Sequence, residues 1–320
     1  MKILFSGSPS IAVPSLESIH SLEKTGYIEE IELCGVLTNP DTAKGRHGTP
    51  LPTDVGAAAA RLGVNQILKP VKLDAATREQ VDALKPDLLV SFAYGRLFGP
   101  KFLALFPLGG INIHPSLLPK YRGPTPLQAA ILNRDTVTGI TIQTLAKEMD
   151  SGDIILQEEL FLTGKETLGS LSDIAAVKAA LMLPSVMKKF TDSGSFQDFK
   201  PQDHEKASYC SLISKKDGII DWLQSAAVIE AKIRAFDPWP LCWTIHNGRE
   251  LIILKADVYP DQSDKHPPGT VLGNDKNYGI LIQTGQGILG VTQLQYQAKK
   301  ALFWRDFLNG ARDFTGSQLN

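Results

Sequence analysis

The sequence lacks the residues that mark several large classes of protein. Its 320 residues contain only three cysteines, Cys34, Cys210 and Cys242, which are odd in number and far apart. Such spacing favours neither a disulfide framework nor a zinc site, and we predict that the protein holds no metal. The net charge of -1 provides no overall attraction to nucleic acid, so any RNA contact must come from a local basic patch.

Long apolar runs are also missing. We find no run that approaches the roughly 18 to 20 residues needed to cross a bilayer, and the first residues read as a strand rather than a signal peptide. We therefore expect a cytoplasmic protein that does not enter a membrane. Hydrophobic residues make up 43% and charged residues 21%, a composition typical of a globular protein, and the length favours two domains.

Short apolar strands alternate with helical patterns through the first half of the chain. The expected strands are residues 2–6, 32–38, 66–68, 88–92 and 111–114. The expected helices are residues 11–21, 53–62, 74–84 and 127–133. This alternation predicts an α/β fold with a mostly parallel sheet covered by helices on both faces.

The pattern changes after Gly139. We expect an antiparallel edge pair at 140–145 and 153–162, and then a long helix at 168–190. A polar stretch follows, and beyond it a helix at 225–235 precedes short strands separated by glycine, proline and asparagine turns, as in a small β-barrel. These strands are residues 251–255, 269–272, 279–283 and 287–295. The predicted domains are 1–190 and 207–320, joined by a linker at 191–206.

The residues most suggestive of chemistry lie in the segment 110–124. Asn112 and His114 are two apart on an expected strand, so they project from one face, and Pro115 should end that strand. Ligands of open α/β sheets bind at the carboxyl ends of the strands, where an amide and an imidazole would converge on one atom. Alternatively, Asn112 is a turn residue and His114 a surface histidine or one with a structural hydrogen bond.

A second group of polar residues lies on a tight turn between two expected strands. Asp150 and Asp153 are both candidate carboxylates there, and spacing does not choose between them. A turn aspartate that bonds its own backbone is the alternative for either one.

Together these segments resemble a known family. Residues 111–119 read Ile-Asn-Ile-His-Pro-Ser-Leu-Leu-Pro, followed by Arg122-Gly123 and later by Asp150-Ser151-Gly152-Asp153-Ile154. This run is similar to the active-site signature of the 10-formyltetrahydrofolate-dependent formyltransferases. The resemblance implies a Rossmann-like catalytic domain and an OB-like second domain. It assigns catalysis to Asn112, His114 and Asp150, and folate contacts to Ser116, Leu117, Leu118 and Pro119.

Other segments are similar to the methionyl-tRNA formyltransferase branch of that family. They are Phe5-Ser6-Gly7-Ser8-Pro9 at the start, the loop after Thr38, and residues 233–240. The resemblance implies a monomer that moves formyl from 10-formyltetrahydrofolate to the α-amino group of initiator methionyl-tRNA. The products would be formylmethionyl-tRNA, for translation initiation, and tetrahydrofolate. It also implies tRNA contacts at Lys44, Arg46, Lys299 and Lys300, although the loop at 41–49 is only modestly basic.

For the chemistry, we expect Asn112 and His114 to donate to a tetrahedral oxyanion, while Asp150 favours the imidazolium and moves a proton. Related enzymes that formylate glycinamide ribonucleotide or a sugar nucleotide, or that hydrolyse or oxidise the donor, share this signature. A chain that continues past about Ala207 argues against the first of these. A catalytically inactive folate-binding or RNA-binding module is the alternative outside enzymes.

Overall fold

The protein is described from a computed structural model, which covers residues 1–28, 31–43, 48–193, 199–261, 265–311 and 313–320. The chain forms two compact units. The first unit comprises Met1–Pro126, Val137–Phe161 and Ser172–Ser211, and the second comprises Leu127–Thr136, Leu162–Leu171 and Leu212–Asn320.

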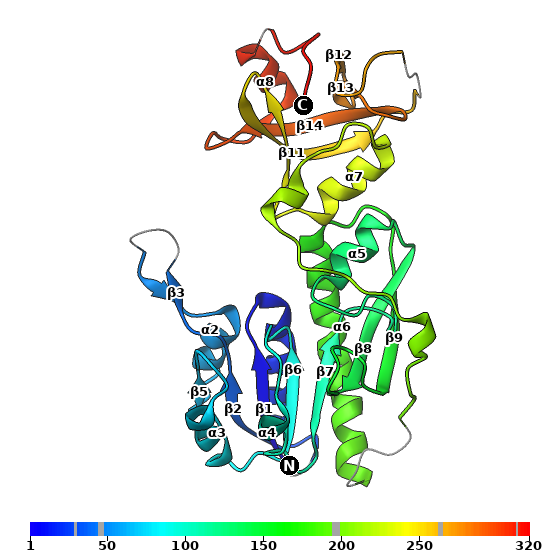
Figure 1. The fold of residues 1–320 in the computed structure, drawn as a ribbon. Coiled ribbons are helices and arrows are strands. Elements are labelled where there is room, and N and C mark those ends of the chain that lie inside the picture. The colour runs from blue at the N-terminus through cyan, green and yellow to red at the C-terminus, as the bar shows by residue number, and fades with distance from the viewer. Residues whose placement is uncertain (29–30, 44–47, 194–198, 262–264, 312) are drawn as a thin grey trace. The chain divides into compact units, whose positions relative to one another are not determined.

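A seven-stranded sheet with the order β5-β2-β1-β6-β7-β8-β9 is the centre of the first unit (Figure 1). Its strands are β1 (Lys2–Gly7), β2 (Glu32–Leu37), β5 (Ile67–Leu68), β6 (Leu88–Phe92), β7 (Gly110–His114), β8 (Val137–Thr144) and β9 (Ile154–Phe161). Neighbours from β5 to β7 are parallel, whereas β8 is antiparallel to both β7 and β9. The predicted α/β fold, with a mostly parallel sheet and an antiparallel edge pair, is confirmed.

Helices lie on both faces of this sheet. They are α1 (Val13–Thr25), α2 (Asp54–Arg61), α3 (Ala75–Asp82), α4 (Pro100–Leu103) and α6 (Leu168–Ser193), whereas α5 (Pro126–Leu132) belongs almost wholly to the second unit. Leu4 of β1 packs in one cluster with Val81 of α3 and Phe102 of α4. Its neighbours Ile3 and Phe5 are fully buried on the opposite face, because successive strand side chains alternate. The short helix α4 was not predicted, and neither were the small strands β3 (Thr42–Ala43) and β4 (Pro50–Leu51).

Helix α6 corrects the expectation that no apolar run reaches membrane length. The stretch Leu168–Thr191 has a mean hydropathy of 1.3 and is long and apolar enough, by length and composition alone, to cross a bilayer. However, Ala179 and Leu183 on its inner side are fully buried, and Ser18 Oγ of α1 donates to the Ala180 carbonyl oxygen. The helix therefore has the packing of a core helix in a globular unit.

Antiparallel strands in the order β10-β11-β14-β13-β12 form the second unit, and β15 pairs with β14. The strands are β10 (Cys242–His246), β11 (Arg249–Val258), β12 (Val271–Asp275), β13 (Gly279–Gln283), β14 (Ile288–Tyr296) and β15 (Leu302–Phe303). The helices are α7 (Ala226–Ala235) and α8 (Trp304–Gly310). A short 3₁₀ turn at Lys215–Gly218 also lies in this unit, and two others, at Ser10–Ala12 and His204–Lys206, lie in the first. Strands β10 and β15 and helix α8 were not predicted.

The C-terminal tail joins the two edges of this sheet. On one side, Val271 N donates to Ser317 O over 3.0 Å and Leu319 N donates to Gly269 O over 2.9 Å. On the other side, Ile245 of β10 and Asn320 exchange two backbone hydrogen bonds of 2.9 and 3.1 Å. The tail thus closes the sheet, and the prediction of a small β-barrel is confirmed.

Candidate active site

Strand β7 and its neighbour β8 present a row of polar side chains. Asn112 of β7 lies directly opposite Gln143 of β8 in the antiparallel register, so their side chains share one face of the sheet. His114 lies two residues after Asn112 and is therefore on the same face, as its spacing predicts. Asn112 is half-buried, whereas His114 is buried. Of this pair, Asn112 is the more accessible to a ligand.

Asp150 reaches this row from the turn between β8 and β9. Its Oδ1 accepts hydrogen bonds from Asn112 Nδ2 at 3.3 Å and from Gln143 Nε2 at 3.2 Å. Its Oδ2 accepts one from the Gly123 backbone N–H at 2.8 Å. Asp150 has a φ of 51°, in the left-handed region that a residue with a Cβ enters at a cost of about 1 to 2 kcal/mol. The contacts made by the carboxylate help to hold this turn.

His114 lies between a carbonyl group and the Asp150 carboxylate. Nε2 is 2.9 Å from the Tyr121 carbonyl oxygen, and because a carbonyl can only accept, Nε2 carries a proton. Nδ1 is 3.6 Å from Asp150 Oδ2. Burial lowers the pKa of His114, and this outweighs the opposing effects of the Asp150 charge and the Tyr121 hydrogen bond. The free protein therefore holds a neutral ring, although Asp150 favours the imidazolium as expected.

The loops that follow β1, β2 and β6 are linked beside this site. Asn39 Nδ2 donates to Ser8 Oγ at 2.9 Å and to the Tyr94 carbonyl oxygen at 3.0 Å. These three residues follow the carboxyl ends of parallel strands, the edge at which ligands of α/β sheets bind. The sequence indicated the edge but not this connection.

The loop Ser116 to Pro119 is held tightly by the sheet. Thr141 Oγ1 donates to Ser116 O at 2.7 Å, Leu118 N donates to Thr141 Oγ1 at 3.2 Å, and Gln157 Nε2 donates to Leu118 O at 3.0 Å. Ser116 and Leu118 are buried, whereas Leu117 and Pro119 are half-buried. The backbone groups of Ser116 and Leu118, two residues that the resemblance assigns to folate contacts, are thus engaged within the protein.

Two of the four residues expected to contact tRNA lie within the described part of the chain. Lys299 and Lys300 are both exposed on the turn between β14 and β15. Lys44 and Arg46 lie outside the described residues.

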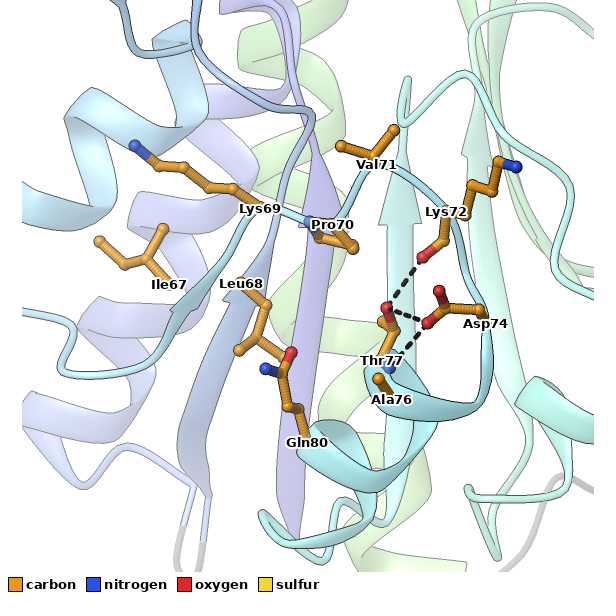
Figure 2. Close-up of a pocket in the computed structure, with 10 residues that line it drawn as sticks. All are labelled: Ile67, Leu68, Lys69, Pro70, Val71, Lys72, Asp74, Ala76, Thr77 and Gln80. Carbon is orange, nitrogen blue, oxygen red and sulfur yellow. Dashed lines mark hydrogen bonds between the residues drawn. The ribbon is translucent and has the colours of Figure 1, made fainter.

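A surface pocket of about 470 Å³ lies elsewhere in the first unit, along the loop after β5 and the start of α3 (Figure 2). Asp74 caps α3 there, accepting hydrogen bonds from both the N–H and the hydroxyl of Thr77. The lining includes none of the three residues expected to be catalytic. Within the described part of the chain, no group of three or more His, Cys, Asp or Glu side chains could hold a metal ion.

Three buried polar residues of the site were given no role by the sequence: Arg122, Gln143 and Gln202. A glutamine at position 143, in a strand otherwise made of aliphatic residues, threonine and glycine, was a usable signal. By contrast, Gln202 is 80 residues from Arg122 and 52 residues from Asp150, and nothing local in its polar segment marks it as buried.

Comparison with known proteins extends over the whole chain. Residues 1–187 match the formyl transferase family and residues 212–312 match the formyl transferase C-terminal domain family. A methionyl-tRNA formyltransferase of Treponema denticola is 50% identical, with 98% of each chain covered. One from Roseiflexus castenholzii is 39% identical, over 100% of this chain and 99% of the relative.

Similarity to a solved structure is more distant and concerns the fold alone. The N-formyltransferase of Helicobacter canadensis, crystallised with folinic acid and dTDP-3-aminofucose, is 20% identical, with a TM-score of 0.64 over 91% of this chain and 99% of that one. The sequence matches cover both units at high identity, and the chain therefore belongs to the formyltransferase family, among the methionyl-tRNA formyltransferases.

Proposed function

We propose that the protein transfers the formyl group of 10-formyltetrahydrofolate to the free α-amino group of initiator methionyl-tRNA. The products are formylmethionyl-tRNA, for translation initiation, and tetrahydrofolate. The observation that carries the choice of acceptor is the 50% identity to the Treponema denticola enzyme across 98% of both chains, which includes the second unit. The folinic acid bound by the Helicobacter canadensis relative supports a folate donor. Because charged tRNA is the acceptor, we place the reaction in the cytosol.

Asn112 is proposed as the main donor to the oxyanion that forms when the amine adds to the formyl carbon. One N–H of Nδ2 is directed to Asp150 Oδ1, which leaves the second N–H of this half-exposed side chain for the ligand. A donor of this kind contributes roughly 2.7 to 4 kcal/mol to stabilising the transition state.

His114 and Asp150 are proposed to move the proton. The attacking α-amino group must lose a proton, and Nδ1 of a neutral His114 is a base next to Asp150 Oδ2. The imidazolium formed there is stabilised by the Asp150 carboxylate and can return the proton to the departing folate nitrogen. Both ring nitrogens face protein groups in the free structure, so direct contact of His114 with the oxyanion requires one of these contacts to be exchanged.

The loop Ser116 to Pro119 is proposed to contact the folate. Half-buried Leu117 and Pro119 offer an apolar surface to a flat ring, while buried Ser116 and Leu118 hold the loop in place.

Lys44, Arg46, Lys299 and Lys300 are proposed to contact the tRNA backbone. We expect Lys299→Ala with Lys300→Ala to raise KM for methionyl-tRNA, leave kcat unchanged and reduce the salt dependence of binding by about one unit of slope per lost phosphate contact. Lys276→Ala, on another exposed turn of the same sheet, is the matched control. An equal rise in KM for the control would contradict a specific contact.

The central experiment measures formyl transfer from 10-formyltetrahydrofolate to methionyl-tRNA, with glycinamide ribonucleotide and an amino sugar nucleotide as rival acceptors. We expect transfer to methionyl-tRNA, and a loss of kcat of about 100-fold to 1000-fold in Asn112→Ala and Asp150→Ala. Asp153→Asn, on the same turn, serves as the control and should retain activity. Transfer to a small acceptor alone would overturn the proposed substrate.

A further inference from the structure

The segment between the long helix α6 and the second unit is paired with the first unit. Lys200 and Ile154 exchange backbone hydrogen bonds of 3.1 and 2.9 Å. Further along, Arg122 N donates to Ser208 O at 2.8 Å, and Cys210 N donates to Arg122 O at 2.8 Å. We call residues 199–211 the strap. It runs beside both loops that surround Asp150, in a region whose composition indicates a surface linker.

Gln202 is the buried residue of this strap, with 5% of its surface exposed. Its Oε1 accepts from Arg122 Nε at 3.1 Å and from Arg122 Nη2 at 2.7 Å. Its Nε2 is 2.9 Å from Asp150 O, 2.6 Å from Gly152 O and 3.1 Å from Gln143 Oε1. A guanidinium only donates and a backbone carbonyl only accepts, so these partners determine which end of the amide is which.

These contacts hold both the backbone and the carboxylate of Asp150. The Gln202 amide binds the Asp150 carbonyl oxygen directly, which fixes a backbone with a φ of 51°. It also binds Gln143 Oε1, which orients the Gln143 amide so that Nε2 points at Asp150 Oδ1, 3.2 Å away. Since a left-handed non-glycine residue persists only where its surroundings determine it, Gln202 supplies a constraint that this turn requires.

Arg122 in turn fixes the orientation of the Gln202 side chain. Its side chain is almost completely buried, with 1% of the residue exposed, and its guanidinium contacts the side chains of Gln202, His204 and Tyr209 at hydrogen-bond distance. A buried cation is costly unless its donors are satisfied, so the two hydrogen bonds to Gln202 Oε1 hold both side chains in a single arrangement.

We propose that Gln202 is a positioning residue for Asp150 in formyl transfer, an inference that rests on the proposed function. It acts by holding the Asp150 carboxylate where Asn112 and His114 can use it, and it makes the strap a part of the catalytic unit. Misplacement of a reacting group by about 1 Å costs on the order of 100-fold in rate, so a small movement of this turn is sufficient.

Two substitutions separate positioning from folding. Gln202→Glu keeps an acceptor for Arg122 but loses the N–H groups that bind Asp150 O and Gly152 O, whereas Gln202→Met loses both functions. For Gln202→Glu we expect a fall in kcat of about tenfold to 100-fold, little change in KM for either substrate, and a Tm near that of the wild type. The added negative charge should also move the pH profile of kcat upward, and Gln202→Met should not. Glu205→Gln, exposed on the same strap, is the control.

A double variant tests whether the effect passes through Asp150. In the Asp150→Asn background, Gln202→Glu should cost little further activity, because residues that act as one unit are not additive. Wild-type kcat in Gln202→Glu, a loss explained by a lowered Tm, or additive losses in the double variant would each overturn the inference. If the wild type fails to formylate methionyl-tRNA, the proposed acceptor is wrong, and the same comparison is made on acceptor-free release of tetrahydrofolate from the donor.

Discussion

His114 illustrates how burial and charge oppose one another at a single residue. The Asp150 carboxylate and the Tyr121 carbonyl both favour a protonated ring, yet loss of water around the imidazole has the larger effect and lowers the pKa. A neutral base next to a carboxylate is suited to accepting a proton from an amine, whereas a permanent imidazolium would not be.

We expect the imidazole of His114 to titrate below its ordinary value in NMR spectra of the free protein, and lower still in Asp150→Asn. In the unfolded chain, the pKa of this histidine is at its ordinary value of about 6.5, whereas in the native protein it is lower. The contribution of neutral His114 to the free energy of unfolding is therefore fully present above the unfolded pKa. It is lost as the pH falls, because the unfolded chain then binds the proton more readily than the native protein does. His114→Asn identifies the signal, and titration above the ordinary value would contradict this account.

For individual residues, the sequence predicted part of the candidate site. Asn112 and His114 share a face because strand side chains alternate, a rule that depends on neighbours in the chain. The choice of Asp150 over Asp153 came from resemblance, since spacing left both open. The roles of Gln143 and Gln202 depend on contacts with Asp150 across 7 and 52 residues, and only the folded chain reveals such contacts.

In helix α6, residues close together in the chain have very different surroundings. Leu183 is fully buried, whereas Leu181, two residues earlier, is 72% exposed. One side of the helix therefore supports the core of the first unit, and the other contributes little to its stability.

We expect Leu183→Ala to lower the free energy of unfolding by about 2 to 5 kcal/mol, through lost apolar burial and the cavity left behind. Leu181→Ala should change it by less than about 0.5 kcal/mol, as at other exposed sites. Chemical denaturation of both variants measures the difference. Equal effects would show that the inner side of α6 has been misassigned.

Several short elements of the second unit were missed, each for a local reason. Strand β10 has only five residues and follows Pro238 and Pro240, which obscured it. A signal was nevertheless present, because Asn247-Gly248 separates β10 from β11 and both residues have positive φ, as a two-residue hairpin turn requires. Helix α8, with seven residues, is too short for its pattern to be distinguished from a turn.

The second unit depends on its last residues for closure. The backbone hydrogen bonds of residues 316–320 join the strand edges at β10 and β12, and Leu319 is buried. Without them both edges would expose unpaired N–H and C=O groups.

Deletion of residues 316–320 should therefore open the second unit while leaving the first intact. We expect protease cleavage within residues 212–315 to become rapid, a lower Tm for one of two transitions, and weak binding of methionyl-tRNA. The substitution Gln318→Ala, which keeps the backbone pairing, is the control. Resistance to protease equal to that of the full chain would show that the tail is dispensable.

The strap has a consequence for how such an enzyme can be divided or recombined. If the catalytic part of the chain were truncated at the end of α6, the buried Arg122 guanidinium would lose its acceptor on Gln202. The backbone of the Asp150 turn would lose its hydrogen bond from the same residue. A transferable catalytic half must extend to Ser211, where the first unit ends. Exchange of acceptor-binding halves between related enzymes should accordingly succeed when the junction is placed after that residue, and yield folded but slow enzymes when it is placed before Lys200.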